Sequence, residues 1–390
     1  MHNGTSPVNR RHHIVIVPLF AALLIIACSR SLFLPEGERI SSEWLVFRGN
    51  PQHSGFLPLD TSSPFSLRWM YETEGAIVSS PIIATGLVYV ASWDKKIHVL
   101  NPLTGDRIGR LRLKGSISST PVMSGARLFV GSEHPDGRMY AFNMISGQVE
   151  WRTKALDINS SPAVDRGKLF FGSGNGALYA VSTDSGRVLW TFKTGGAVRS
   201  SPLVTNDMVC FGSMDRWVYA LDAHTGEVVW KHETRGTIDS SPAVQNEIVY
   251  IGSSDSTLYA LDTATGNPIW TVQTEGSIHS SPAVDESTCY IGSYDGSVYA
   301  IRAQTGDVVW KWSTQSIIRS SPAVSSQAVF IGAHDGSFYV IDKRTGTLLW
   351  TYKTEGSITS SPALSSAGIY VGSDDGNVYA FGFREAEGKE

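Results

Sequence analysis

The chain has 390 residues, of which 42% are hydrophobic and 17% are charged, so it can bury a substantial core. Its formal net charge is −4. This weakly acidic balance argues against non-specific nucleic-acid binding, which depends on neutralising phosphates with basic side chains. Thirty-eight glycines and 11 tryptophans favour a protein with many tight turns and a recurring aromatic anchor over an α/β enzyme.

The first 27 residues have the pattern of an export signal. Arg10 and Arg11 precede an uncharged apolar run at residues 14–27. A basic segment followed by so short an apolar run is typical of a secretory signal and short for a bilayer span. The alternative is an anchor helix that is not cleaved.

The end of this signal resembles the lipobox of bacterial lipoproteins. The motif is Ile25-Ile26-Ala27-Cys28, and the resemblance implies that Cys28 is acylated and becomes the mature N-terminus. Several acyl chains together would anchor the protein firmly to a membrane. Ser29 follows in place of aspartate, which in such lipoproteins implies the outer membrane, with the protein facing the periplasm.

The rest of the chain is dominated by a repeat. A Ser-Ser-Pro or Ser-Thr-Pro triplet recurs every 40 or 41 residues, with its proline at Pro81, Pro121, Pro162, Pro202, Pro242, Pro282, Pro322 and Pro362. The unit at residues 236–275 contains four short runs rich in Val, Ile, Tyr and Trp, bounded by Gly, Asp, Asn or Ser. Such runs predict strands and turns. Four strands in forty residues is the period of a propeller blade.

Counting the strands predicts a closed ring. The last repeat ends after three strands, whereas an unpaired fourth strand, residues 67–73, precedes the first triplet. Pairing the two completes an eighth blade and leaves no open sheet edge. The fold class is therefore all-β, an eight-bladed β-propeller of four-stranded antiparallel blades. We assign residues 1–27 to the signal, 28–43 to a linker, 44–65 to a lead-in, 66–383 to the propeller and 384–390 to a charged tail.

A tryptophan begins the fourth strand of nearly every repeat. An indole side chain buries a large apolar surface area, and we predict that each tryptophan docks its blade on the next one. One repeat has Gly109 instead, and its joint is expected to be the weakest. The other two cysteines, Cys210 and Cys289, are predicted to be buried and unpaired. The docking residues are Trp69, Trp151, Trp190, Trp230, Trp270, Trp310 and Trp350.

The run Ala-Leu-Asp-x-x-Thr-Gly-x-x-x-Trp from Ala220 to Trp230 resembles the docking motif of pyrroloquinoline-quinone-type propellers. Residues 44–55 resemble the lead-in of the same superfamily. It includes quinone-dependent alcohol dehydrogenases and the BamB-type lipoprotein of the outer-membrane β-barrel assembly machinery. The dehydrogenases hold quinone and calcium under a disulfide between adjacent cysteines, and no two cysteines are adjacent here. The spacing also leaves room for turns only, without long insertions.

Positions that vary between repeats are candidates for function. One lies three residues before each repeat proline, where the innermost strand starts at the mouth of the channel. The second-to-third turns add aromatic and imidazole groups to the same face. Arginine and aromatic side chains dominate binding surfaces. We predict binding residues at Asn159, Arg199, Asp239, His279, Arg319, Trp93, Trp217, Tyr294 and His334.

The sequence thus favours a non-enzymatic, monomeric envelope lipoprotein that binds proteins or peptides during outer-membrane β-barrel assembly, with no cofactor and no metal. Alternatives are a quinone-dependent dehydrogenase, a small-ligand sensor, or turn positions that simply drift. His134, His279 and His334 belong to different repeats and show no ligand spacing, which argues against a metal site.

Overall fold

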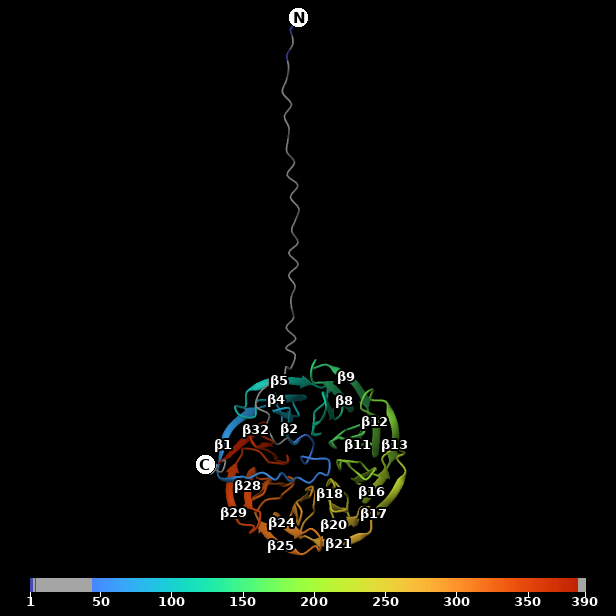
Figure 1. Cartoon of the computed structure of the whole chain (residues 1–390), viewed down its shortest axis with the longest axis vertical. Helices are drawn as coiled ribbons and strands as arrows, with labels where there is room; N and C mark the ends of the chain where they lie inside the picture. Colours follow the sequence, from blue (N-terminus) through green and yellow to red (C-terminus); the bar gives the residue numbers. More distant parts are fainter. Residues whose placement is uncertain (3, 5–43, 385–390) are drawn as a thin grey trace, which may run out of the picture. The chain divides into compact units, whose positions relative to one another are not determined.

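The computed structural model describes residues 1, 2, 4 and 44–384. Residues 44–384 contain strands and no helix, and the strands form eight four-stranded antiparallel sheets arranged as the blades of a ring (Figure 1). The predicted eight-bladed β-propeller is therefore confirmed. Cys28 and nearly all of the predicted signal lie outside the described residues. Among the residues that are described, no helix could span a membrane.

The first four blades, each listed from the channel outward, are β2 (Ile82–Ala84), β3 (Leu87–Ala91), β4 (Lys96–Leu100) and β5 (Arg107–Arg112); β6 (Val122–Ser124), β7 (Arg127–Gly131), β8 (Arg138–Asn143) and β9 (Val149–Lys154); β10 (Ala163–Asp165), β11 (Lys168–Ser173), β12 (Ala177–Ser182) and β13 (Val188–Lys193); β14 (Leu203–Thr205), β15 (Met208–Gly212), β16 (Trp217–Asp222) and β17 (Val228–Glu233).

The last four blades, in the same order, are β18 (Ala243–Gln245), β19 (Ile248–Gly252), β20 (Thr257–Asp262) and β21 (Pro268–Gln273); β22 (Ala283–Val284), β23 (Thr288–Gly292), β24 (Ser297–Arg302) and β25 (Val308–Ser313); β26 (Ala323–Val324), β27 (Ala328–Gly332), β28 (Ser337–Asp342) and β29 (Leu348–Lys353); β30 (Ala363–Ser365), β31 (Gly368–Gly372), β32 (Asn377–Arg384) and β1 (Ser62–Glu72).

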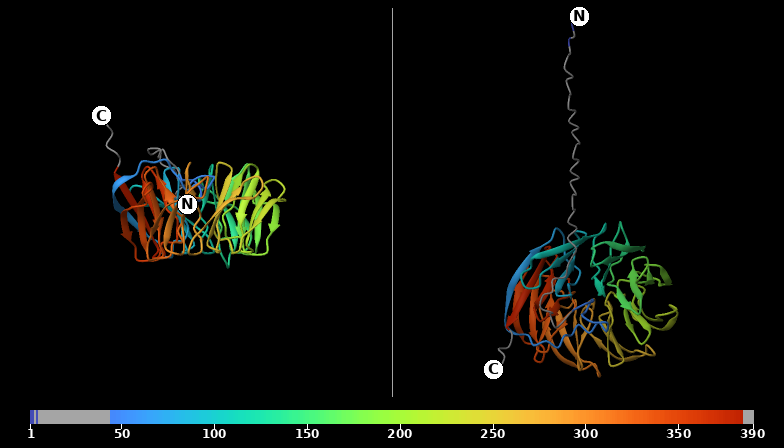
Figure 2. Two further views of the ribbon diagram at one scale, coloured as in Figure 1. Left: turned by 90° about the horizontal axis from the view of Figure 1, so that it is seen from below. Right: turned by 45° about the horizontal axis from the view of Figure 1, so that its top comes forward.

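The eighth blade is closed by the first strand of the chain. β1 pairs antiparallel with β32, with Trp69 opposite Ala380 and Glu72 opposite Asn377. β1 begins at Ser62, so it takes in the end of the segment assigned to the lead-in. Figure 2 shows the blades side by side around the ring, with the first and last strands together.

The tryptophans lie between successive blades. The indole N–H of Trp230, for example, donates to the carbonyl oxygen of Thr263 in the next blade at 2.8 Å. The same bond joins Trp69, Trp151, Trp190, Trp270 and Trp310 to the blade that follows each of them. The ring lies so close to the next blade's turn that a Cβ atom on Gly266 would be 2.4 Å from Trp230. Only glycine fits this turn, where φ is also positive.

The joint between blades 1 and 2 is built differently. Gly109 occupies the tryptophan position in β5, and nothing lies within 4 Å of where a Cβ atom on Gly147 would be. Phe142 and Met144 of blade 2 are buried in the cluster that fills this joint, together with Tyr89 of blade 1. The place beside the turn glycine that a tryptophan ring fills in other joints is therefore open here.

The lead-in crosses one face of the ring (Figure 1). Trp44 forms a bridge with Ile83 in blade 1, and the carbonyl oxygen of Leu45 accepts from Met123 in blade 2 at 3.2 Å. Further along, Gln52, Ser54 and Gly55 accept backbone hydrogen bonds from blades 5, 6 and 7. The segment 44–61, called the strap below, therefore ties opposite sides of the ring together.

Candidate functional site at the channel mouth

A closed circle of hydroxyl groups surrounds the channel. In each blade the backbone N–H of the residue before the repeat proline donates to the hydroxyl of the equivalent residue in the next blade, at 2.8–3.3 Å. The circle runs through Ser80, Thr120, Ser161, Ser201, Ser241, Ser281, Ser321 and Ser361 and returns to Ser80. This geometry explains why a hydroxyl residue precedes every repeat proline.

The first serine of the triplet has a different partner. Ser160 donates to the carbonyl oxygen of Gly172 on the second strand and accepts its N–H, at 3.0 and 2.8 Å. That glycine must stay small, because a Cβ atom there would lie 2.4 Å from Val198 in the next blade. The two fixed hydroxyl residues thus hold the inner strand in place. The variable residue directly before them faces the channel mouth.

The hydroxyl circle lines a central cavity of about 490 Å³. Phe47 of the strap also lines it, at the end of the channel that the strap crosses, and it packs edge-on against His53. The channel is therefore a pocket with one mouth. Predicted binding residues found in its lining are Trp93, Asn159, Arg199, Asp239, His279, Arg319 and His334.

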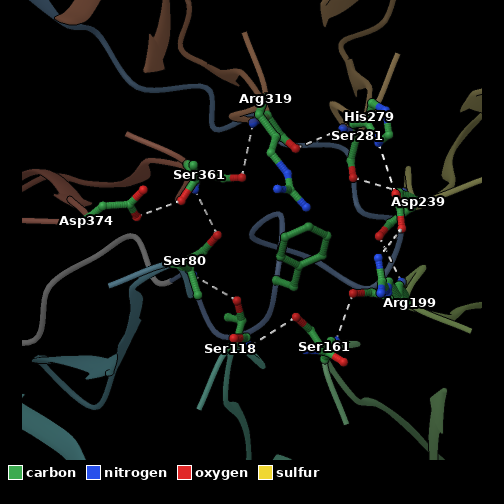
Figure 3. A pocket seen from close by; sticks show the side chains of 18 of the residues that line it. Ser80, Ser118, Ser161, Arg199, Asp239, His279, Ser281, Arg319, Ser361 and Asp374 are labelled. Atoms are coloured by element: carbon green, nitrogen blue, oxygen red, sulfur yellow. Dashed lines mark hydrogen bonds and ion pairs between the residues drawn. The ribbon is translucent and has the colours of Figure 1, made fainter. Parts of the chain in front are cut away.

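Asp239 is the centre of one charged cluster in this pocket (Figure 3). His279 Nδ1 lies 3.0 Å from one carboxylate oxygen, and Arg199 lies 3.9 Å from the other. Burial alone would raise the pKa of Asp239, but the hydrogen bond and charge of His279, with the charge of Arg199, bring it below its usual value. Asp239 Oδ1 is buried and has no hydrogen-bond donor, so it can accept one from a ligand.

A second cluster lies on blades 1–3 around Glu133. Its carboxylate accepts hydrogen bonds from the Ser118 hydroxyl and, at 2.7 Å, from the Asn159 amide. The indole N–H of Trp93 donates to Ser118 at 2.9 Å. This carboxylate is already engaged by neutral donors, and the Trp93 ring is held at the mouth with 47% of its surface exposed.

Arg319 projects into the pocket without a protein partner. Figure 3 shows its side chain extending toward the centre of the cavity. No described residue forms a hydrogen bond or an ion pair with its guanidinium. Arg199, by contrast, is paired with Asp239. Arg319 is therefore the free cation of the described pocket lining, and it can bind a carboxylate by charge-assisted hydrogen bonds.

Asp374 completes the mouth on blade 8. Burial raises the pKa of its carboxyl, although a 3.0 Å hydrogen bond from Thr359 and the charges of His334 and Arg319 oppose the shift. The pocket thus combines a free cation, a free buried acceptor and an exposed aromatic ring. That combination suits a peptide segment, which can offer a carboxylate to the cation, a backbone N–H group to the acceptor and a side chain to the aromatic ring.

Other predicted residues lie outside this lining. Trp217 stacks against the Lys231 ammonium at 4.2 Å, toward the outer strand β17. Tyr294 is not a lining residue either, but it stacks on His279 with ring centroids 4.5 Å apart and so supports it. Of the nine predicted binding residues, seven therefore line the pocket, and Trp217 and Tyr294 do not.

The structure adds two residues that the sequence did not single out, Phe47 and Glu133. Glu133 is adjacent to His134, and sequence alone did not show which side chain of this turn enters the pocket. Phe47 lies in the strap, which has no second copy in the chain to be compared with. The resemblance of residues 44–55 to the lead-in of similar propellers gave no direction for the side chain.

The residues present do not fit a quinone and calcium. Within residues 44–384 no group of three or more His, Cys, Asp or Glu side chains is arranged to hold a metal ion. Cys210 and Cys289 are buried and unpaired, as predicted. Burial raises the pKa of the Cys210 thiol to about 12. The carboxylates of the pocket belong to separate clusters instead of forming one set of ligands.

Comparison with known proteins identifies the family. The family model described as outer membrane protein assembly factor BamB matches residues 66–157, 135–274 and 254–389. The chain belongs to this family. It is 25% identical over 140 residues to the outer membrane protein assembly factor BamB of Nitrosomonas eutropha, a match to 35% of this chain and 33% of that protein. The match thus spans about a third of this curated relative.

Two further similarities bear on fold and function. The crystal structure of BamB from Moraxella catarrhalis superposes with a TM-score of 0.72 at 18% identity, over 82% of this chain and all of that one. The quinohemoprotein alcohol dehydrogenase ADH IIB of Pseudomonas putida is 25% identical over 188 residues, 40% of this chain and 27% of the enzyme. The chain is therefore a BamB-type propeller, and its fold is shared with quinone enzymes.

Proposed function

We propose that this protein is a non-enzymatic scaffold of the bacterial envelope that takes part in outer-membrane protein assembly. The family match across residues 66–389 carries the proposal. Two features of the propeller support it. The connections are short turns, which leave no insertion to cover a substrate. The channel mouth also presents Arg319 without an ion pair to the described residues, and Asp239 Oδ1 without a hydrogen-bond donor.

The pocket is the proposed binding surface for an extended segment of a partner protein. Arg319 would bind a carboxylate of that segment, and Asp239 Oδ1 would accept one of its backbone N–H groups. Trp93 would pack against a neighbouring side chain, since exposed tryptophan rings are frequent anchors of protein interfaces. Strap residue Phe47 limits the depth of insertion. The protein is proposed to act as a monomer, held to the outer membrane by acylation of Cys28 and facing the periplasm.

The test is purification of the full chain from gently solubilised envelopes, followed by identification of the proteins that accompany it. We expect outer-membrane assembly proteins in stoichiometric amounts, and their loss from the Arg199→Ala/Arg319→Ala double variant. Arg319→Ala alone should cause most of the loss, because Arg199 is already paired with Asp239. The melting temperature should not change, since both side chains are exposed.

A matched control is available on the same face. Arg235 lies in a similar interblade connection and is exposed, but it does not line the pocket. Arg235→Ala should therefore retain the partners. If the double variant kept its partners, or lost them only together with thermal stability, the channel mouth would not be the binding surface.

The alternative activity, oxidation of alcohols with a quinone, has its own test. It is favoured only by the similarity to the quinohemoprotein dehydrogenase. Purified protein supplied with pyrroloquinoline quinone, calcium and an alcohol should not reduce an electron-accepting dye. Turnover under these conditions would contradict the scaffold proposal.

A further inference from the structure

The outer strands of blades 1 and 2 carry more arginine and lysine side chains than the other outer strands. β5 and the residues after it carry Arg107, Arg110, Arg112 and Lys114, and β9 carries Arg152 and Lys154. All six side chains are exposed, and we call them the basic rim. β5 and β9 lie next to each other at the outer edge of the ring (Figure 1). A chain with a net charge of −4 thus concentrates positive charge on one side.

These cations are left without carboxylate partners. No described carboxylate lies within 4.0 Å of any of the six, and the nearby acids are engaged elsewhere, Glu74 with Lys96 and Glu150 with Arg127. On the other outer strands basic residues are single and engaged, as in Arg68, Lys193, Lys231, Lys311 and Lys353. Apart from the Arg152 guanidinium, which lies over the Tyr140 ring at 5.9 Å, the basic rim makes no ion pair or cation–π contact with the described residues.

Exposed apolar side chains accompany the basic rim. Leu103 and Ile145 occupy the same position in the third-to-fourth turns of blades 1 and 2, and they are 60% and 68% exposed. The equivalent positions in the next five blades are Asp184, His224, Ala264, Gln304 and Arg344. Ile108, between the arginines of β5, is also exposed. Large apolar residues beside a basic strand suit a surface that is anionic outside and apolar beneath.

The chain also enters the propeller on this side. Trp44 is bridged to Ile83 of blade 1, and Leu45 is hydrogen-bonded to Met123 of blade 2. Cys28, the proposed site of acylation, precedes Trp44 by 16 residues, which span at most about 55 Å when extended. A tether of this length allows blades 1 and 2 to reach the membrane surface.

We infer that the basic rim docks on anionic phospholipid headgroups, with Leu103, Ile108 and Ile145 inserted at the edge of the bilayer. This docking would hold the propeller with blades 1 and 2 against the membrane, so that the channel mouth opens along the surface instead of onto it. The inference rests on the proposed envelope location, but it requires no protein partner. Each basic side chain near an anionic surface strengthens such docking appreciably.

The test uses the full chain reconstituted into vesicles of phosphatidylcholine alone or with about 30% phosphatidylglycerol, a mixture that carries the anionic surface charge in question. Hydrogen–deuterium exchange is measured in residues 107–114 and 143–148. The equivalent residues 262–275 of blade 5 serve as the internal control. We expect slower exchange in blades 1 and 2 on the anionic vesicles only, reversed by 0.5 M salt because salt screens exposed charges.

Two triple variants with the same net charge separate position from charge. Arg110→Ser/Arg112→Ser/Lys114→Ser should shift the docked equilibrium about 100-fold and abolish the protection. Lys231→Ser/Lys311→Ser/Lys353→Ser, on the outer strands of blades 4, 6 and 7, should leave the protection intact. Melting curves establish that both variants fold.

Several outcomes would overturn the inference. These are equal protection of blades 1 and 5, equal protection on both lipid mixtures, and equal loss in the two triple variants. Protection that appeared only after an acidic envelope protein was added would also overturn it and would make the basic rim a protein-binding surface. Because the vesicles contain no other protein, a negative result here leaves the partner-binding test of the channel mouth unaffected.

Discussion

The backbone N–H of Ser361 donates to the hydroxyl of Ser80 at 3.1 Å, although the two residues are 281 positions apart. This bond closes the hydroxyl circle from the inside, just as the pairing of β1 with β32 closes the ring from the outside. The eighth blade is thus joined to the first by the same contact that joins every other pair of blades.

We predict that Ser80→Ala destabilises the propeller by about 1–3 kcal/mol, because it leaves the buried N–H of Ser361 without an acceptor. The free energy of unfolding in urea measures the effect. Thr120→Ser keeps the hydroxyl at an equivalent place in the circle and should cost less than about 1 kcal/mol. Equal losses in the two variants would show that the hydroxyl hydrogen bond is not what matters.

The joint without a tryptophan depends on Met144. Replacing this buried residue with alanine removes most of a side chain that packs in the core cluster of blades 1 and 2, and should cost about 2–4 kcal/mol. Its neighbour Ile145 is 68% exposed, so Ile145→Ala should change stability by less than about 0.5 kcal/mol. Thermal unfolding of both variants checks the prediction, and a small effect of Met144→Ala would mean that the joint is loosely packed.

Acid should weaken blade 1 through Asp94, whose side chain is 1% exposed and lies 2.9 Å from His98 and 3.2 Å from Lys96. Burial alone would raise its pKa, but these two partners lower it from 3.8 to about 2. The lowered pKa stabilises the fold above pH 4, and this contribution, about 2 kcal/mol, disappears as the pH falls from about 4 to 2. Urea unfolding across this range should show a larger loss in the native protein than in Asp94→Asn, because other carboxyl groups with lowered pKa values, such as Asp255 and Asp295, titrate in both proteins.

His53 should make the strap sensitive to milder acid. It is buried beside the carbonyl oxygen of Pro242, and burial lowers its pKa from 6.5 to about 4. The imidazole is neutral in the folded strap and becomes protonated more readily in the released chain. Stability of the strap is therefore present above pH 6.5 and lost as the pH falls toward 4.

Hydrogen exchange in residues 44–61 measures this release. It should accelerate between pH 6.5 and 4, after correction for the intrinsic pH dependence of exchange, while exchange in β19 and β20 stays constant. His53→Gln, which cannot titrate but can still donate to Pro242, should remove the dependence. Acceleration that persisted in this variant would assign the effect to another group.

Repetition made most of the fold predictable. Ser80 and its seven counterparts recur every 40 or 41 residues because each makes the same contact with the next blade. The ring of blades and its closure could therefore be predicted from the sequence. So could the face of the propeller on which the varying residues lie. Arg319 was found because it stands where other repeats have Val78 or Ser118. Its freedom from partners could not be predicted, since it depends on which carboxylates the neighbouring turns direct toward it.

Single segments were harder to interpret. The strap has no internal copy, so nothing in the sequence indicated that Phe47 reaches the channel or that Arg48 is buried against Pro282. The tryptophan pattern identified Gly109 as an exception, but not that Phe142 and Met144 are buried in the core cluster of blades 1 and 2. These arrangements follow from how side chains fill space between blades, and local sequence does not encode that.

The pairing of β1 with β32 also sets an order in time. β1 is among the first parts of the propeller to be synthesised, and its partner is among the last. Until β32 is made, β1 and the edge of the eighth sheet both remain unpaired, and such edges invite association with other chains. A chain that crosses a membrane before it folds has all of its blades available at once. Its β1 and β32 could then pair in one step, with the intervening blades holding the two ends close together.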